Sequence, residues 1–184
     1  MTEKATTSNE SELVHRAIKR DAEAFGDLYM LHLDKIYRYI FYKVGNEREA
    51  EDLTEQVFLN AWEAIEGYQH RGYPFSSWLY RIAHNVVIDY YRTGKEEEPL
   101  DDVAFTLADE NLKPEELLVQ KAEVARLREA IVQLPEKKQE LILLRFVEGL
   151  SHAQVAEILG KSEGSCRVMQ HRALSALSEI LGEH

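Results

Sequence analysis

Two arginines, Arg167 and Arg172, flank a stretch of sequence whose side chains are suited to reading DNA. An arginine can donate two hydrogen bonds to a guanine, and an apolar group can contact the methyl of thymine. At 100° per residue one helix face collects Gly164, Val168, His171 and Ser175. No acid falls between residues 164 and 178. The candidate base-reading residues are Ser165, Arg167, Val168, His171 and Arg172.

The residues around this face predict a helix-turn-helix. Ala156 is small enough for two helices to approach closely, and Gly160 suits a turn that needs positive φ. Ser162 is a good N-cap for the second helix, which in this unit lies in the major groove of DNA. An ordinary helical hairpin is the alternative. The expected buried stripe is Cys166, Met169, Ala173, Leu177 and Ile180, which makes Cys166 a packing residue rather than a reactive thiol.

A second group of candidates lies in the loop before a predicted helix at residues 76–91. The loop offers aromatic, cationic and flexible groups that could hold an unstacked base, and Arg81 and Arg92 on the helix suit phosphates. Trp78 is a tempting stacking platform, but its spacing with Leu79, Ile82 and Val86 favours the core. The candidates are Gln69, His70, Arg71, Gly72, Tyr73, Arg81, Asn85 and Arg92.

A third candidate surface lies on the predicted helix at residues 47–65. Its apolar face contains Leu53, Val57 and Trp62, and its polar face is either a docking surface or simply solvated. The polar residues are Asp52, Glu55, Gln56 and Asn60.

Patterns typical of catalysis are missing. The sequence contains no glycine-rich phosphate loop, no dinucleotide fingerprint and no His-Glu-x-x-His motif. Its seven histidines show no i, i+3 or i+4 pairing that would place two imidazoles on one helix face. We therefore expect no metal site, no cofactor and no enzymatic activity.

Composition indicates a cytoplasmic protein. The hydrophobic content is 45% and 30% of the 184 residues are charged, which is ordinary for a globular chain. No apolar run approaches the roughly 18 residues that span a bilayer, so no membrane insertion is expected. The polar N-terminus does not resemble a secretory signal, and a single cysteine suits a reducing compartment.

The net charge of −11 is unfavourable for binding DNA, because neutralising phosphates supplies most non-specific affinity. The acids concentrate between residues 94 and 123, where ten of them face three lysines, whereas residues 71–95 are basic. We expect weak DNA binding by the free protein and a partner that supplies the remainder.

Helical periodicity predicts an all-α fold of two small helical domains joined by an acidic linker. The expected ranges are 10–93 for the first domain, 94–114 for the linker and 115–184 for the second domain with its helix-turn-helix. In the first domain we expect a first helix capped by Asp21 or by residues 9–11, with apolar positions between Leu13 and Tyr29, and a second helix at residues 33–44.

Taken together, the motifs resemble bacterial extracytoplasmic-function (ECF) sigma factors, the smallest specificity subunits of RNA polymerase. The resemblance covers residues 21–92 and 124–181. It rests on Asp21-Ala-Glu-Ala-Phe25, on Ala50 to Trp62, on Phe75 to Asn85 with Asp89 and Arg92, and on Leu134-Pro135, Leu144-Arg145 and Glu148 to Ser151 before the helix-turn-helix.

The resemblance implies a role for each surface. The polar face with Asp52, together with Leu53, would bind the β′ coiled coil of core RNA polymerase, and the β flap would be a further contact. The loop at residues 69–73 would capture a flipped base of the melted −10 element, with Asn85 lining the pocket. The face with Arg167 would read the −35 element as duplex DNA. The acidic linker would lie in a basic channel of polymerase, or else be a solvated tether.

The sequence departs from the family pattern in two places. Glu55-Gln56 reverses the commoner order, and Gln139, Met169 and Leu174 stand where many relatives carry arginine. We therefore expect promoter binding to depend strongly on tethering by polymerase. The resemblance also implies an anti-sigma factor as a partner, as for many relatives. The alternatives are a stand-alone helix-turn-helix regulator and a helical nucleic-acid-processing enzyme.

Overall fold

The computed structural model describes residues 2–94 and 114–182, which are helical, with no strand among them. They fall into two compact units, one within residues 1–96 and the other within residues 97–184. The predicted all-α fold is thus confirmed. The acidic linker expected at residues 94–114 lies outside the described residues, apart from its first and last positions.

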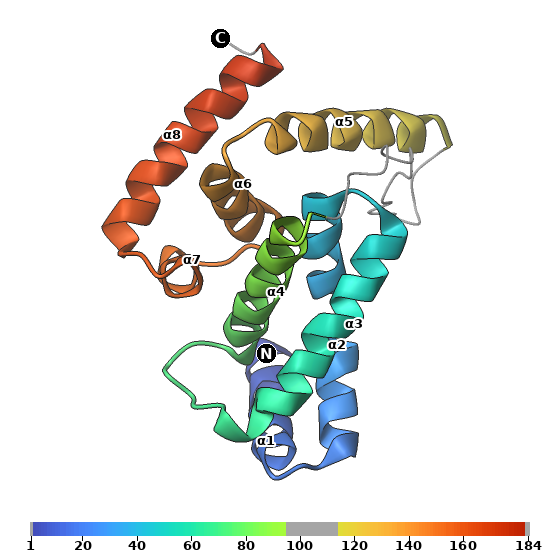
Figure 1. The fold of residues 1–184 in the computed structure, drawn as a ribbon, viewed down its shortest axis with the longest axis vertical. Coiled ribbons are helices and arrows are strands. Elements are labelled where there is room, and N and C mark those ends of the chain that lie inside the picture. Colours follow the sequence, from blue (N-terminus) through green and yellow to red (C-terminus); the bar gives the residue numbers. More distant parts are fainter. Residues whose placement is uncertain (1, 95–113, 183–184) are drawn as a thin grey trace. The chain divides into compact units, whose positions relative to one another are not determined.

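The first unit contains four α-helices and one short turn. They are α1 (Thr2–Ile18), α2 (Ala22–Val44), α3 (Glu47–Ala64), the 3₁₀ turn η1 (Ile65–Gly67) and α4 (Phe75–Arg92) (Figure 1). The expected start of a second helix at residue 33 is wrong, because the chain turns at residues 19–21 and α2 then runs unbroken to Val44. Asp21 caps α2, accepting hydrogen bonds from the backbone N–H groups of Glu23 and Ala24, each at 3.1 Å.

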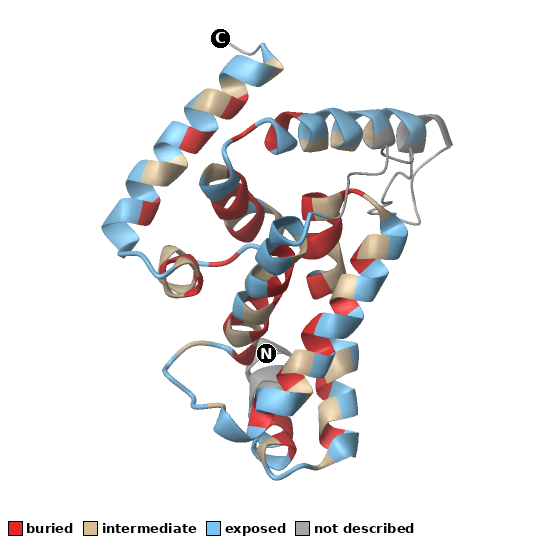
Figure 2. Cartoon of the chain, in the orientation of Figure 1, coloured by how far each residue is buried: buried red, intermediate tan, exposed pale blue. Residues whose placement is uncertain are grey.

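The core of the first unit is rich in aromatic side chains. Tyr39 and Tyr80 are fully buried and pack edge to face, with ring centroids 5.6 Å apart. Tyr29 of α2 meets Phe58 of α3 at 4.7 Å. In Figure 2 the ribbon of each helix alternates between buried segments in red and exposed segments in pale blue, as expected for amphipathic helices.

The second unit contains α5 (Pro114–Val132), α6 (Glu136–Ile142), the π-helical turn η2 (Leu143–Val147), α7 (His152–Leu159) and α8 (Glu163–Leu181). Its core includes Ile131, Leu141, Leu143, Leu144 and Val155. Pro135 lies at the N-cap of α6 and separates that helix from α5.

Candidate nucleic-acid and polymerase interfaces

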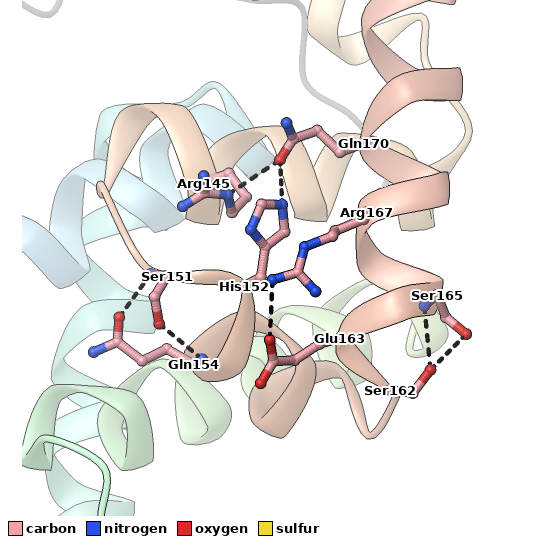
Figure 3. Close-up of polar contacts among 9 residues, drawn as sticks. All are labelled: Arg145, Ser151, His152, Gln154, Ser162, Glu163, Ser165, Arg167 and Gln170. Carbon is pink, nitrogen blue, oxygen red and sulfur yellow. Dashed lines mark hydrogen bonds and ion pairs between the residues drawn. The ribbon is translucent and has the colours of Figure 1, made fainter.

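Local capping rules build the helix-turn-helix in the second unit. Ser151 begins α7 with a reciprocal cap, since its hydroxyl accepts from the Gln154 N–H at 3.2 Å and its own N–H donates to Gln154 Oε1 at 2.7 Å. Gly160 ends α7 with φ 63°, as its sequence position predicted. Ser162 then caps α8 by accepting from the Ser165 N–H at 3.1 Å. Figure 3 shows both serine caps.

The buried side of α8 is narrower than the sequence pattern indicated. Cys166, Ala173 and Leu177 are buried, whereas Met169 is half-buried and Ile180 is exposed near the end of the helix. Burial raises the pKa of Cys166, so its thiol stays protonated at neutral pH. Cys166 is therefore suited to packing, as expected, rather than to thiolate chemistry.

The opposite side of α8 presents the predicted base-reading side chains to solvent. Ser165, Arg167, Val168, His171 and Arg172 are all exposed. Sequence reasoning overlooked Glu163, whose Oε2 lies 3.3 Å from Arg167 Nη2 (Figure 3). Such i, i+4 pairs on a helix surface are worth only about 0.3–0.5 kcal/mol. Arg167 can therefore exchange Glu163 for a base at little cost.

A polar cluster that the sequence did not reveal fastens α8 to the rest of its unit. Gln170 Oε1 accepts a hydrogen bond from Arg145 Nε in η2 at 3.2 Å and another from His152 Nε2 in α7 at 2.8 Å (Figure 3). Because an amide oxygen only accepts, His152 carries a proton on Nε2. Arg145 also donates to the Leu150 carbonyl oxygen. One amide thus connects three helical segments and sets the direction of α8.

In the first unit, the loop between η1 and α4 presents its candidate residues together. Gln69, His70, Arg71 and Gly72 are exposed and Tyr73 is half-buried. Gly72 has φ 79°, and its N–H donates to His70 Nδ1 at 3.3 Å, which folds the loop back on itself.

Aromatic packing closes the base of this loop. The Tyr68 ring lies 5.4 Å from Phe75 and 5.1 Å from Trp78, measured between centroids. Trp78 itself is half-buried, so it is part of this cluster rather than of the deep core.

A cavity of about 710 Å³ lies between the loop and α1. Its walls include Val14 and His15 from α1 and Tyr68, His70 and Tyr73 from the loop. The lining is largely apolar and includes several aromatic rings, with a few polar groups among them, which suits a flat heterocycle. Asn85 is not part of this lining and is exposed about 15 Å further along α4.

The exposed side of α4 carries the remaining candidates for DNA contact. At 100° per residue, Arg81, Asn85 and Arg92 fall within about 40° of one another, and all three are exposed. The sequence did not reveal that Asp89 Oδ1 lies 3.0 Å from Arg92 Nη2. This pair is well exposed, so Arg92 can release Asp89 for a phosphate.

The polar face of α3 is exposed at Asp52, Glu55 and Gln56, whereas Leu53 and Asn60 are half-buried. Gln56 Nε2 donates to Asn60 Oδ1 at 2.7 Å, which holds both amides along the helix.

Leu59 is a residue that the sequence reasoning missed on this face. Its side chain is 58% exposed, between Gln56 and the half-buried Asn60 along the helix. The sequence feature that could have identified Leu59 is its position as an apolar residue on the polar side of an amphipathic helix. An exposed apolar side chain surrounded by polar groups matches the apolar centre and polar rim of a protein–protein interface.

Two structural features bear on other classes of function. Within residues 2–94 and 114–182 no group of three or more His, Cys, Asp or Glu side chains is placed to hold a metal ion. No helix in the described part of the chain is long and apolar enough to cross a membrane.

Comparison with known proteins agrees with this arrangement. The family model of Sigma-70 region 2 matches residues 28–97, and that of Sigma-70 region 4 matches residues 125–177. ECF RNA polymerase sigma factor SigW of Bacillus subtilis is 33% identical over 89% of this chain and 91% of its own length. ECF RNA polymerase sigma factor BldN of Streptomyces coelicolor is 38% identical over 92% of this chain, which spans 65% of that relative.

Solved structures show the same fold. CnrH, in complex with the cytosolic domain of CnrY, has a TM-score of 0.73 at 24% identity, covering 95% of this chain and 97% of CnrH. The sigma factor RpoE, in complex with the anti-sigma factor NepR from Bartonella quintana, has a TM-score of 0.68 at 20% identity, covering 88% and 98% of the respective chains.

Two helical units with these region matches define a protein of the sigma-70 class. Within that class, the chain belongs to the ECF sigma factors of RNA polymerase. The resemblance inferred from the sequence motifs is confirmed, and the stand-alone regulator is not favoured.

Proposed function

We propose that this protein binds core RNA polymerase and directs it to selected promoters, whose −35 and −10 elements it contacts through its second and first units. The observation that carries the proposal is the recognition helix α8. Its outer face exposes Arg167, Val168 and His171, while its inner face is buried at Cys166 and Ala173. This is how a major-groove helix must be oriented.

For the −35 element, we assign base contacts to Arg167, Val168 and His171, with Ser165 and Arg172 at the flanks. The charges on α8 balance, because Glu163 and Glu179 offset Arg167 and Arg172. Affinity for duplex DNA from this helix alone should therefore be low. Attachment to polymerase supplies the high local concentration that makes such a weak contact effective.

For the −10 element, we assign base capture to the loop residues Gln69, His70, Arg71, Gly72 and Tyr73. The cavity beside the loop supports this assignment because it is large enough for a base and is lined by aromatic rings. Arg81, Asn85 and Arg92 then follow the strand along α4. Extrusion of a base costs a few kcal/mol, which stacking and hydrogen bonds in the cavity would offset.

For polymerase, we assign the α3 face of Asp52, Glu55, Gln56 and Asn60, with Leu53 packing beneath it. The β′ coiled coil is the proposed partner there, and the β flap is the proposed partner of the second unit. We also propose that an anti-sigma factor binds this protein, since two relatives of the same fold were solved in complexes whose partners are CnrY and the anti-sigma factor NepR. Promoter selection itself requires no catalytic step by this chain.

The test is a titration of the labelled protein with bacterial core RNA polymerase, followed by competition with the housekeeping sigma factor. We expect competitive binding with nanomolar affinity. Asp52→Lys should weaken it at least tenfold, whereas Asp27→Lys, at an exposed acid on α2, should leave it unchanged. Tight duplex binding without polymerase, together with no binding to core, would instead support the stand-alone regulator.

A further inference from the structure

Arg20 occupies an unfavourable backbone conformation in the turn between α1 and α2. Its φ is 66°, and among the described residues it is the one non-glycine residue with positive φ. An L-residue in this region crowds its Cβ against the backbone, which glycine avoids. The fold holds an arginine in this turn at an energetic cost, so the contacts of its side chain must offset that cost.

Those contacts are concentrated on the end of α3. Arg20 Nη1 donates to the Trp62 carbonyl oxygen at 2.7 Å, and Nη2 donates to the Glu63 carbonyl oxygen at 3.4 Å. The guanidinium also lies 5.1 Å from the centroid of the Trp62 ring. The last carbonyls of a helix lack partners within the helix and carry its negative dipole end, so a cation is favourable here.

The same guanidinium also holds the short turn that follows. Arg20 Nε lies 3.0 Å from Glu66 Oε1, and Nη2 donates to Glu66 Oε2 at 3.2 Å. A fork of two N–H groups on one carboxylate fixes orientation as well as distance. Arg20 therefore holds both sides of the point where α3 ends and the chain turns toward the loop at residues 69–73.

An aromatic cluster joins the two ends of the loop, since Tyr68 lies at its start and Phe75 and Trp78 lie at its end. Tyr68, Phe75 and Trp78 pack together across its base. The start of the loop is thus held by the ionic clamp at Glu66 and, two residues later, by the packing of Tyr68. The cavity is lined by this loop and by α1, the helix that precedes Arg20.

We propose that Arg20 is a positioning residue for promoter melting, which fixes the start of the loop so that the cavity beside it is formed before a base enters. This inference rests on the proposed role of the loop in base capture. A preformed pocket avoids the entropy cost of ordering the loop when the base is extruded, and so speeds opening of duplex DNA. A promoter that is already unpaired needs less of this assistance.

The test compares two templates with reconstituted holoenzyme: a fully paired promoter, and the same promoter with a mismatched −10 region. The variant is Arg20→Gly, which removes the clamp and also relieves the backbone strain. We expect its unfolding temperature to stay within about 4 °C of the parent protein and its affinity for core polymerase to be unchanged. Opening of the paired promoter should slow about tenfold, whereas the mismatched promoter should be used at nearly the parent rate.

Arg16→Ala is the matched control. Arg16 is also an arginine at the end of α1, but its Nε pairs with Asp21 at 2.8 Å, within the same turn. Arg16→Ala should leave the rate of opening unchanged on both templates. Glu66→Gln keeps the shape of the side chain but weakens its ion pair with Arg20. Like Arg20→Gly, it should slow opening of the paired promoter. Hydrogen exchange should quicken at residues 66–73 in both clamp variants.

Equal activity of Arg20→Gly and the parent protein on paired DNA would overturn the inference, and so would an equal loss on both templates. Arg71→Ala, in the exposed loop, separates this failure from that of the proposed function. If Arg71→Ala selectively slows the paired promoter and Arg20→Gly does not, only the role of Arg20 is wrong. If neither variant distinguishes the templates, the base-capturing role of the loop is wrong as well.

Discussion

Replacing Gln170 by leucine should destabilise the second unit selectively. The amide oxygen of Gln170 accepts from Arg145 in η2 and from His152 in α7, while Gln170 itself belongs to α8. Leucine has a similar size but no acceptor. The substitution therefore removes the hydrogen bonds that join three segments and leaves two partly buried donors without this acceptor.

The expected loss in free energy of unfolding follows from the two hydrogen bonds that Gln170 accepts. A net hydrogen bond between neutral groups contributes about 1 kcal/mol, and one from a charged donor contributes about 1.5 kcal/mol at the lower end of its range. The site is only partly buried, so we use these lower values, and leucine regains a little apolar contact. We expect a loss of about 2 kcal/mol, which for a unit of this size lowers the unfolding temperature by roughly 8–16 °C.

The assay is urea and thermal unfolding, with probes placed in each unit so that their transitions are resolved. Gln133→Leu is the matched control, because Gln133, just after α5, makes an exposed hydrogen bond to the Glu129 carbonyl oxygen of that helix at 3.3 Å. It should change stability by less than about 0.5 kcal/mol. The first unit should unfold as in the parent protein. If Gln170→Leu and Gln133→Leu unfold alike, the cluster does not fasten α8 and the reasoning is refuted.

Two further predictions concern the first unit. Glu10 Oε1 lies 2.9 Å from His32 Nε2, and this hydrogen bond holds the pKa of Glu10 below its ordinary value of 4.5. This contribution to stability is present above pH 4.5 and is lost as the pH falls through the lower pKa of Glu10 in the folded state. Glu10→Gln should therefore make the free energy of unfolding fall less steeply with acidification than in the parent protein. An unchanged dependence on acidic pH would contradict this. Leu59→Ala should weaken binding to core polymerase about tenfold with little loss of stability, because the side chain is 58% exposed. Met30→Ala, at a 70% exposed residue on α2, should change neither the affinity for core polymerase nor the stability. Equal affinities of the two variants in the core titration would remove Leu59 from the docking face.

The parts of the structure that follow local rules could be predicted from the sequence. Gly160 and Ser162 bound the turn of the helix-turn-helix as their residue types required. The exposed face of α8 followed from the spacing of Cys166 and Ala173. Ile180 has the same spacing but is exposed, although Arg126 of α5 donates to the carbonyl oxygen of the next residue, Leu181.

The errors arose where long-range contacts decide the structure. The turn at residues 19–21 contains neither glycine nor proline, and Asp21 as a candidate N-cap was the one local sign that a new helix begins there. Arg20 is held in that turn by partners 42 to 46 residues away. The Gln170 cluster likewise joins residues separated by 18 and 25 positions. No periodicity in a single sequence reports such pairs.

The contacts of Arg20 and those of Gln170 have the same physical consequence for the recognition of DNA. Apart from the half-buried Tyr73, the residues proposed to contact DNA are exposed. We expect the direction of α8 to depend on Gln170 and that of the loop at residues 69–73 to depend on Arg20. Neither residue is among the proposed contacts with DNA. Discrimination by a helix or loop depends on placing its donors accurately, since an error of about 1 Å can cost 10²-fold in rate. Substitutions at these two positions should therefore change promoter selection and opening even though every proposed contact residue is retained.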